Sequence, residues 1–471
     1  MKDPALMTYR DAAAALAVSG LRGELVPAGV SGGFSSVVVD SRKAVPGALF
    51  VALKGEKSDG HRHIAGAFRQ GAAAALVSGQ GMAEAGFRPE EAGPDKVFVV
   101  SDETLAAFHC LAAAYLDRFP KLVRVGITGS AGKTTTKEIA AAMTGGEKTT
   151  VTNEGNLNSE TGLPLSVFSV RDSHEVGIFE AGMNAKGEIG SLAAVLRPAL
   201  ALVTCIGPAH IGILGSLDAI ASEKKQIFSR FTGKETALIP EDDPFADFLS
   251  TGVKGNTVRY GQQSLEAKGV LGAIRDRGLA GTEIVWEGVP AVFGLPGKHN
   301  VKNAIAAAAI ARELGISGES VRRGLASVKP LFGRGEILRG KTTVIRDCYN
   351  ANPVSAAEAI DFCDGVPWPG RKIYIIGAML ELGSYSEKAH AELGKRIAVS
   401  NCDMAFFYGK ETAPAAEALS EGKLPFEYTG DMDELKRAVS GFIRPGDLVL
   451  LKGSRGCALE ELSDIVLMKG N

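Results

Sequence analysis

One short segment restricts the fold more than any other, a glycine-rich turn that joins an apolar run to a helical one. Residues 123–128 (VRVGIT) are typical of a buried strand, and the pattern from Lys133 to Met143 is helical. The turn between them consists of Gly129, Ser130, Ala131 and Gly132. In a strand–turn–helix of this kind, backbone N–H groups and the start of the helix bind phosphates. The segment therefore predicts a nucleotide-binding α/β domain.

The first helical residues carry side chains suited to a nucleotide. Lys133 is expected to reach the β and γ oxygens of a triphosphate and the Thr134 hydroxyl to bind Mg²⁺, with Thr135 completing the loop. The strict Gly-x4-Gly-Lys-Ser/Thr pattern requires glycine where this chain has Ile127, with a glycine just before it. A chance glycine-rich turn is the alternative, which the flanking strand and helix disfavour. ATP and Mg²⁺ are the expected ligands.

Length and composition indicate several globular domains. The 471 residues exceed the usual ~100–200 residues of one domain, which suggests roughly three. Hydrophobic residues make up 45% and charged residues 23%, which excludes a disordered chain. Six scattered cysteines without CxxC spacing predict buried free thiols rather than a disulfide scaffold.

Charge and hydropathy exclude two classes of partner. A net charge of −2 with both signs interspersed provides no basic stripe, so nucleic acid is not an expected partner. The first residues, Met1-Lys2-Asp3-Pro4, lack the basic start of a signal peptide. No window reaches the ~18 uncharged apolar residues of a spanning helix. We expect a cytoplasmic monomer without membrane insertion.

Apolar runs alternate with helical stretches along most of the chain, which predicts parallel α/β sheets. A helical pattern over 105–118 precedes the strand of the phosphate loop, and a Lys-Pro pair at 329–330 follows an alanine-rich helix expected at 303–314. Between 252 and 295, alternating strands with glycine turns predict antiparallel hairpins. The predicted domains are residues 1–104, a central domain 105–330 and a doubly wound C-terminal domain 331–471.

A carboxylate follows the predicted strand at 176–179. Open α/β sheets bind their ligands at the carboxyl ends of the strands, and Mg²⁺ prefers oxygen donors. Glu180 is therefore a candidate Mg²⁺ ligand, and a solvated glutamate at a strand end is the alternative reading.

Motifs spread over nearly the whole chain resemble the Mur ligases of peptidoglycan precursor synthesis, and their order and spacing together are specific. They are Asp40-Ser41-Arg42, Leu49 to Gly55, Thr128 to Glu138, Gly155-Asn156-Leu157-Asn158, Glu180 to Asn184, Ala209-His210, Lys224, Gly297 to Asn300 with Asn303, Gly333-Arg334, Asp347, Tyr349 to Pro353, Met379 to Gly383 and Lys452 to Arg455. Within the family, Tyr349-Asn350-Ala351-Asn352-Pro353 and the segment from Met379 to Gly383 indicate the member that adds D-alanyl-D-alanine.

The resemblance implies a three-domain α/β architecture: an N-terminal domain that binds the UDP end of the substrate, a central P-loop ATPase domain, and a C-terminal Rossmann-like domain that closes over the nucleotide. It also implies that ATP phosphorylates the terminal carboxylate of UDP-MurNAc-tripeptide and that the amine of D-alanyl-D-alanine attacks the acyl phosphate. The products are an amide, ADP and phosphate. Phosphorylation is needed because a carboxylate is a poor electrophile, and its catalysis is mainly positioning plus positive charge.

The resemblance assigns catalytic roles to a few side chains. Lys133 would neutralise the transferring phosphoryl group, and Thr134 and Glu180 would hold one Mg²⁺. His210 matches the family's ligand to a second Mg²⁺, and Lys224 matches the lysine that is carbamylated and so becomes an oxygen ligand. A structural histidine is the alternative at the former position, and the lysine that directly follows is the rival at the latter.

The remaining matches are assigned to the nucleotide and the substrates. Implied nucleotide contacts are Asn300, Asn303, Arg334 and Asp347. Implied substrate contacts are Ser41, Arg42, Asn156, Asn158, Ser159, Tyr349, Asn350, Asn352, Lys452, Ser454 and Arg455. The last three suit the carboxylate of D-alanyl-D-alanine, with a surface turn as the alternative. On sequence alone, Asn300 also passes for a helix N-cap. The chain departs from the family pattern at Arg346, Ala378 and Ser159.

Three other classes of protein share parts of this pattern. The ligase that adds the third peptide residue is disfavoured because the chain lacks an Asp-Asn-Pro-Arg segment. A folylpolyglutamate synthase would not be expected to carry Asp40-Ser41-Arg42 and the segment from Leu49 to Gly55. A P-loop switch or motor would hydrolyse ATP without forming an amide. No motif distinguishes lysine from diaminopimelate as the third residue of the peptide.

Overall fold

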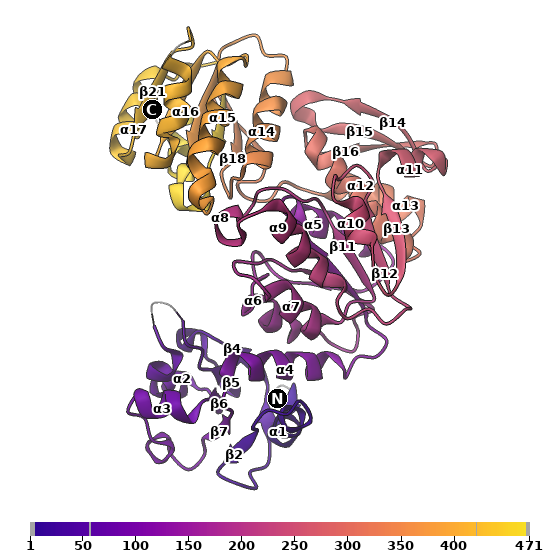
Figure 1. The fold of residues 1–471 in the computed structure, drawn as a ribbon, viewed down its shortest axis with the longest axis vertical. Helices are drawn as coiled ribbons and strands as arrows, with labels where there is room; N and C mark the ends of the chain where they lie inside the picture. Colours follow the sequence, from indigo (N-terminus) through magenta and orange to yellow (C-terminus); the bar gives the residue numbers. More distant parts are fainter. Residues whose placement is uncertain (1–4, 56–57, 421, 468–471) are drawn as a thin grey trace.

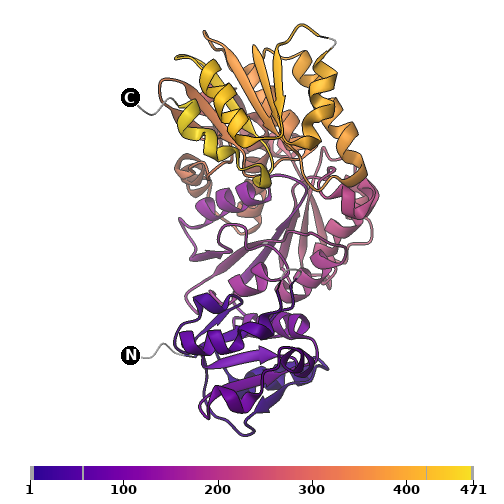
Figure 2. The same ribbon diagram turned by 90° about the vertical axis from the view of Figure 1, so that its left-hand side faces the viewer.

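The chain folds into three α/β units that follow one another along the long axis of the molecule (Figure 1). The structure, a computed structural model, describes residues 5–55, 58–420 and 422–467. The start of the chain, where we expect no signal peptide, lies outside the described residues. Seen from the side, the first unit lies at one end, the last at the other, and the central unit between them (Figure 2).

The first unit is a five-stranded sheet with helices on both faces. Its strand order is β2 (Glu24–Val26), β7 (Val97–Val100), β6 (Ala74–Val77), β5 (Ala48–Val51) and β4 (Ser36–Val38). Only the edge strand β2 is antiparallel to its neighbour. One face is covered by α2 (Ile64–Gln70) and α3 (Gly79–Glu84), and the other by α1 (Tyr9–Val18) and α4 (Thr104–Leu116). A short ribbon of β1 (Met7–Thr8) and β3 (Gly33–Phe34) lies beside this sheet.

The central unit carries the phosphate loop in the middle of an all-parallel sheet. Its strand order is β13 (Asn256–Tyr260), β12 (Thr236–Pro240), β11 (Leu200–Val203), β8 (Val123–Thr128), β10 (Val176–Glu180) and β9 (Thr150–Thr152). One face packs against α5 (Lys133–Thr144), α12 (Lys298–Glu313) and α13 (Gly318–Ser327). The other face packs against α4, α6 (Gly162–Val167), α7 (Glu188–Leu196) and α9 (Leu217–Lys225).

Two predictions for this unit can be compared with the structure. The predicted hairpins are confirmed as an antiparallel sheet of β14 (Leu271–Asp276), β15 (Thr282–Trp286) and β16 (Val289–Phe293). The alanine-rich helix was predicted too late in the sequence, because α12 begins at Lys298 and its first turns are polar. Gly297, with φ 93°, occupies the N-cap position, so the reading of Asn300 as an N-cap is wrong.

The C-terminal unit is a second doubly wound sheet. Its strand order is β17 (Glu336–Arg339), β18 (Thr343–Asp347), β22 (Leu448–Lys452), β19 (Lys372–Gly377), β20 (Met404–Tyr408) and β21 (Phe426–Thr429). Only β17 runs antiparallel to its neighbour. One face is covered by α14 (Pro353–Gly365), α15 (Ser386–Ala398) and α16 (Ala413–Ser420), and the other by α17 (Met432–Phe442) and α18 (Ser463–Val466).

The first and central units share a continuous hydrophobic core. Phe168, which is 5% exposed, lies at the junction. Its ring centroid is 6.4 Å from that of Phe34 in the first unit, 6.2 Å from that of Phe108 in α4 and 5.1 Å from that of Tyr115. Aromatic pairs at such distances contribute beyond their buried area. The cluster therefore fixes the first unit against the central one.

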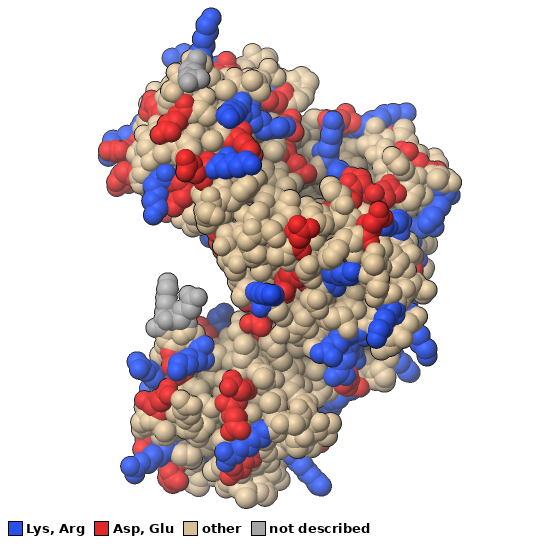
Figure 3. Space-filling model, in the orientation of Figure 1, with Lys and Arg blue, Asp and Glu red and all other residues tan. Residues whose placement is uncertain are grey.

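The surface charges and the cysteines of the structure can be compared with what the composition predicts. Lysine and arginine are interspersed with aspartate and glutamate over the face shown in Figure 3, which is hollowed between the first and last units. Over residues 5–55, 58–420 and 422–467, no helix is both long and apolar enough to cross a bilayer. All six cysteines are free thiols, and four of them are buried.

Removing the Phe168 ring tests the shared core. We expect Phe168→Ala to cost about 3–5 kcal/mol, because a large buried ring leaves a cavity that the surroundings fill only in part. Thermal denaturation should show a midpoint lowered by several degrees, with a smaller loss in Phe168→Leu. Tyr428→Ala, at a ring that is 43% exposed, should leave the midpoint nearly unchanged. Equal midpoints for Phe168→Ala and Tyr428→Ala would contradict this assignment.

Candidate active site

The phosphate loop is held against the loop that follows strand β11. The Ser130 hydroxyl donates to the carbonyl of Gly207 at 2.9 Å and accepts from the Gly207 N–H at 2.9 Å. The Thr204 hydroxyl donates to the Ala131 carbonyl at 2.6 Å. These hydrogen bonds fix the Ser130 hydroxyl and the Ala131 carbonyl. The start of α5 is therefore held in one position, where it can bind a ligand. The first N–H groups of a helix are suited to phosphate.

Neighbouring side chains approach the loop so closely that two of its positions require glycine. Gly129 has φ 148°, and a Cβ there would lie 1.8 Å from Thr204 Oγ1. Gly132 has φ 78°, and a Cβ there would lie 2.2 Å from Asn303 Oδ1. Side chains are strained at positive φ and have no room at either position. The loop backbone can therefore follow this path only with glycine.

Lys133 turns back over the loop. Its Nζ donates to the carbonyl of Gly129 at 3.0 Å. Burial lowers the pKa of Lys133, while the nearby Glu180 carboxylate opposes that shift and the Arg334 guanidinium adds to it. An ammonium poised over a phosphate-binding turn can neutralise a bound phosphoryl group.

Oxygen donors suited to a divalent cation meet beside this lysine. The Thr134 hydroxyl donates to Glu180 Oε2 at 2.6 Å, and Asn158 Nδ2 donates to Glu180 Oε1 at 2.6 Å. Thr134 and Glu180 are both buried. Over the described residues there is no group of three or more His, Cys, Asp or Glu that could hold a metal. The Thr134 hydroxyl and the Glu180 carboxylate are oxygen donors of the kind that Mg²⁺ prefers, and phosphate oxygens and waters would supply its other ligands.

His210 lies at the junction of the central and C-terminal units. It has φ 61° and precedes the short helix α8 (Ile211–Leu214). Its Nδ1 lies 2.9 Å from Glu381 Oε2, close enough for an ion pair although not aligned as a hydrogen bond. The contact lowers the pKa of Glu381. His210 also lines the cavity described below, so both the predicted metal role and the structural alternative remain predictions.

The two candidate lysines of α9 point to different surroundings. Lys224 is buried, and burial together with the charge of Lys133 lowers its pKa to about 7. Lys225 Nζ donates to the carbonyls of Phe248 and Thr251 at 2.7 and 2.6 Å, on the outer side of the helix. Of the two, Lys224 is the one electrostatically coupled to the phosphate loop. It does not line the cavity itself.

The C-terminal unit contacts the phosphate loop directly. Asn352, the N-cap of α14, donates from Nδ2 to the Ser130 carbonyl at 3.2 Å. Lys452 Nζ donates to Asp347 Oδ2 at 2.7 Å, which ties two strand ends of this unit together. The Arg334 guanidinium lies 4.2 Å from the centroid of the Tyr349 ring. A planar cation stacked in this way is held ready for an anionic ligand.

These elements enclose one cavity of about 1230 Å³ between the central and C-terminal units. Ligand sites of drug-sized molecules usually occupy ≈300–1,000 Å³, so this space exceeds the need of a nucleotide alone. The predicted site residues that line it are Ser130, Ala131, Gly132, Lys133, Thr134, Thr135, Asn156, Asn158, Ser159, Glu180, His210, Asn300, Asn303, Arg334, Asp347, Tyr349, Asn350, Asn352, Lys452 and Arg455.

Besides Lys224, four predicted site residues lie away from this lining. Gly129, the first residue of the loop, packs against Thr204. Ser41 and Arg42 belong to the first unit, where the Arg42 guanidinium pairs with Asp40 at 2.8 Å. Ser454 is buried, and its hydroxyl accepts the Leu380 N–H at 3.0 Å. Ser454 therefore braces the loop that carries Glu381.

The departures from the family pattern have local roles. Arg346 pairs with Glu336 at 2.6 Å, and its guanidinium lies 4.3 Å from the centroid of the Phe332 ring, at the connection between the last two units. The Ser159 hydroxyl accepts the Gly162 N–H at 3.2 Å at the start of α6. Ala378 is buried in the core of the C-terminal unit.

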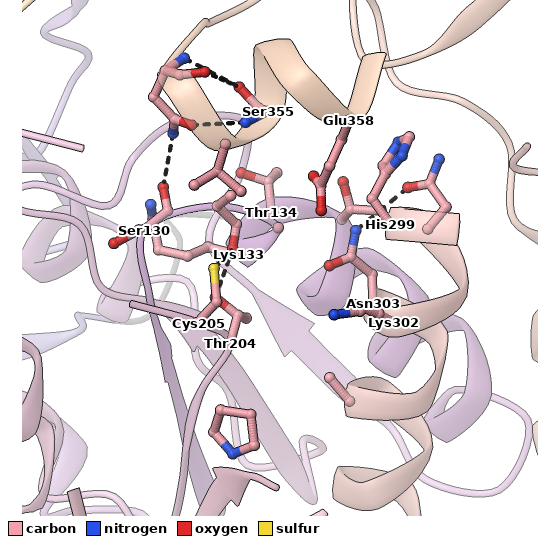
Figure 4. A pocket seen from close by; sticks show the side chains of 18 of the residues that line it. Ser130, Lys133, Thr134, Thr204, Cys205, His299, Lys302, Asn303, Ser355 and Glu358 are labelled. Atoms are coloured by element: carbon pink, nitrogen blue, oxygen red, sulfur yellow. Dashed lines mark hydrogen bonds between the residues drawn. The ribbon is translucent and has the colours of Figure 1, made fainter. Parts of the chain in front are cut away.

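Sequence reasoning missed several residues that line the cavity. Figure 4 shows Thr204 beside the phosphate loop, and Glu358 reaching from α14 toward His299 and Asn303. Burial raises the pKa of Glu358. Thr204 follows the strand β11, so the rule that ligands bind at strand ends could have indicated it. Glu358 gives no such signal, because it lies within a helix of another unit.

Three family descriptions match successive parts of the chain. "Mur ligase family, catalytic domain" matches residues 34–116, "Mur ligase middle domain" residues 127–311, and "Mur ligase, glutamate ligase domain" residues 333–455. The chain belongs to the Mur ligase family. The UDP-N-acetylmuramoyl-tripeptide–D-alanyl-D-alanine ligase of Treponema pallidum is 40% identical to this Mur ligase over 436 residues, which cover 92% of this chain and 94% of that protein.

Solved structures confirm the predicted three-domain architecture. MurF from Acinetobacter baumannii is 26% identical and aligns with a TM-score of 0.86, over 98% of this chain and 99% of that one. MurF ligase from Thermotoga maritima, solved in complex with ADP, is 27% identical with a TM-score of 0.76, over 92% of this chain and 97% of that one. The predicted family and fold of this Mur ligase are therefore both confirmed.

Adding one methyl group at Gly129 tests the loop geometry. Gly129→Ala would force the new Cβ against Thr204 and strain the backbone by ~1–3 kcal/mol. We expect the affinity for ATP, measured by calorimetry, to fall roughly tenfold or more. Gly441→Ala, where the added methyl would meet open space in α17, should bind ATP normally. Unchanged affinity in Gly129→Ala would contradict the assigned geometry.

Proposed function

We propose that this Mur ligase forms an amide bond between UDP-MurNAc-tripeptide and D-alanyl-D-alanine at the expense of ATP. The observation that carries the proposal is the single cavity in which the phosphate loop, a buried carboxylate and the C-terminal unit converge. The relative from Treponema pallidum, named for this reaction, is similar over nearly the whole chain.

The reaction accounts for the layout of the cavity. The terminal carboxylate of the tripeptide attacks the γ-phosphorus of ATP, and ADP leaves. The amine of D-alanyl-D-alanine then attacks the acyl phosphate, loses a proton, and phosphate leaves. Two reactants and a nucleotide must therefore meet in one place shielded from water, which requires more space than the nucleotide alone.

The central unit supplies the groups for phosphoryl transfer. The amides at the start of α5 hold the β- and γ-phosphates, and Lys133 exchanges its bond with the Gly129 carbonyl for one with the γ-phosphate. A Mg²⁺ held by Thr134 and Glu180 would neutralise charge that develops on the transferring group. Asn303, which contacts the loop at Gly132, and Asn300 lie on the adenine side.

The other two units bind the remaining parts of the substrates. Ser41 and Arg42 would contact the UDP end, and Asn156, Asn158 and Ser159 the peptide. In the C-terminal unit, Arg334 and Asp347 would contact the nucleotide. Tyr349, Asn350 and Asn352 would contact the substrates, and Lys452, Ser454 and Arg455 the acceptor dipeptide. Ser454 would act through the loop that it braces.

The proposal also includes the bounds of the functional units, the oligomeric state, the cellular location and a second metal ion. The functional units are residues 1–104, 105–330 and 331–471. The enzyme works as a monomer in the cytoplasm, where nucleotide-activated precursors and ATP are available. His210, which lines the cavity, would bind a second Mg²⁺.

Lys224 would carry a carbamate in the active enzyme. Its uncharged amine adds CO₂ to give an N-carboxylate, and one proton is released. Only the neutral amine reacts, so a buried lysine with a pKa near 7 is suited to this modification. The carbamate would place a negative charge near Lys133, whose positive charge disfavours an ammonium on Lys224.

Coupling between ADP release and both substrates tests the function. We expect ADP release only when UDP-MurNAc-tripeptide and D-alanyl-D-alanine are both present, and mass spectrometry should find the pentapeptide product. Lys133→Ala should lower turnover by at least about a hundredfold while the circular dichroism spectrum is unchanged. Steady ADP release with neither substrate would favour a P-loop switch, and normal turnover in Lys133→Ala would refute the role of that lysine.

The carbamate has its own spectroscopic test. With ¹³C-bicarbonate, the enzyme should show one carbamate resonance that is absent in Lys224→Arg and present in Lys225→Arg. Because the pKa of Lys224 lies near 7, the signal should grow as the pH rises through that value and the neutral amine becomes abundant. Turnover should be lost in Lys224→Arg only. A resonance that persists in Lys224→Arg would contradict the assignment.

A further inference from the structure

A fully buried lysine lies one turn beyond the phosphate-binding residues of α5. Lys137 is 0% exposed, and it follows Thr134 by three residues on the same helix. Its Nζ donates to the backbone carbonyl of Asn153, and it lies 3.0 Å from Glu138 Oε1. Burying an ammonium is costly unless fixed acceptors surround it. The Asn153 carbonyl is such an acceptor, so the lysine links α5 to the chain that follows β9.

Asn153 continues the sheet with its side chain where the strand stops. The last backbone pair between β9 and β10 joins Thr152 to Ile178. Two residues further along β10, Asn153 Oδ1 accepts the Glu180 N–H at 2.9 Å, and Asn153 Nδ2 donates to the Glu180 carbonyl at 3.0 Å. Asn153 is itself fully buried. Both backbone groups of Glu180 are therefore held by one side chain.

The same side chain also shapes the loop that follows it. Asn153 Nδ2 donates to the Leu157 carbonyl at 2.7 Å, and the next residue, Asn158, holds Glu180 Oε1. Gly182 N donates to the Asn158 carbonyl at 2.8 Å on the far side of Glu180. The carboxylate is thus fixed at both oxygens, by Asn158 and by Thr134, and its backbone is fixed by Asn153.

We propose that Lys137 and Asn153 are positioning residues that fix the Glu180 carboxylate against Thr134 and thereby set the affinity of this site for a divalent cation. The inference rests on the proposed role of Glu180 as a metal ligand. Neither residue lines the cavity, so both act through the groups that they hold. Groups that orient a metal ligand from behind commonly change metal affinity when they are replaced.

Mn²⁺ binding measured by electron paramagnetic resonance on the full-length protein with ADP tests the proposal. Lys137→Met keeps the length of the side chain but removes the donor to Asn153, and Asn153→Ala removes the bonds to Glu180. We expect about tenfold weaker Mn²⁺ binding in each, with ADP affinity measured without metal within about twofold of the original. The two variants break the network at different bonds, so the result does not depend on one substitution.

A matched control lies on the same helix. The buried Thr144 hydroxyl donates to the Ala140 carbonyl at 2.7 Å, remote from Glu180 in sequence and at the other end of α5. Thr144→Val removes one buried hydrogen bond and should leave Mn²⁺ binding unchanged. In the coupled reaction, raising the Mg²⁺ concentration should restore kcat in Lys137→Met, which a general loss of folding would not allow.

The outcomes separate this inference from the proposed function. Weaker Mn²⁺ binding in Glu180→Gln, together with unchanged binding in both Lys137→Met and Asn153→Ala, would overturn the positioning role alone. Unchanged Mn²⁺ binding in Glu180→Gln would overturn the metal assignment and the inference with it. Weaker binding in Glu180→Gln, Lys137→Met and Asn153→Ala, but not in Thr144→Val, is the expected result.

Discussion

The close packing of the phosphate loop constrains the rest of this structure. Thr204 presses on it at Gly129 and Asn303 at Gly132, so the path of the loop is set from two sides by elements far apart in the sequence. The central strand β8 delivers the loop, β11 delivers Thr204, and α12 delivers Asn303. Each of these elements must be in place before the helix start can face a triphosphate. The parallel sheet of the central unit is the framework that brings them together.

Local patterns in the sequence predicted the parts of the site that depend on neighbouring residues. The strand, the turn and the helix that presents Lys133 and Thr134 form one continuous segment, and Glu180 ends an apolar run, so simple rules indicate all three. The three α/β units were also predictable from alternating apolar runs. The start of α12 was not, because its first residues are polar and their burial depends on the neighbouring units.

The contacts that join distant segments could not be read from the sequence. Asn153 has no recognisable signature, and its importance appears only once β9 is seen to stop beside Glu180. Glu358 enters the cavity because α14 lies over it, which is a property of how two units pack. Ser454 looked like a substrate contact in a turn, yet the fold buries it against Leu380. Sequence separation hides such relations, since each partner alone resembles an ordinary polar residue.

The aromatic cluster around Phe168 joins the first two units through one hydrophobic core, so packing opposes any change in the spacing between the proposed uridine-binding end and the phosphate loop. A set distance between two binding sites restricts the length of a substrate that can occupy both. Each residue of an extended peptide spans at most about 3.3–3.6 Å, so a precursor one residue short would place its terminal carboxylate that far from the γ-phosphate. With the uridine end bound in the first unit as proposed, the packing of these aromatic rings would favour a substrate of one length.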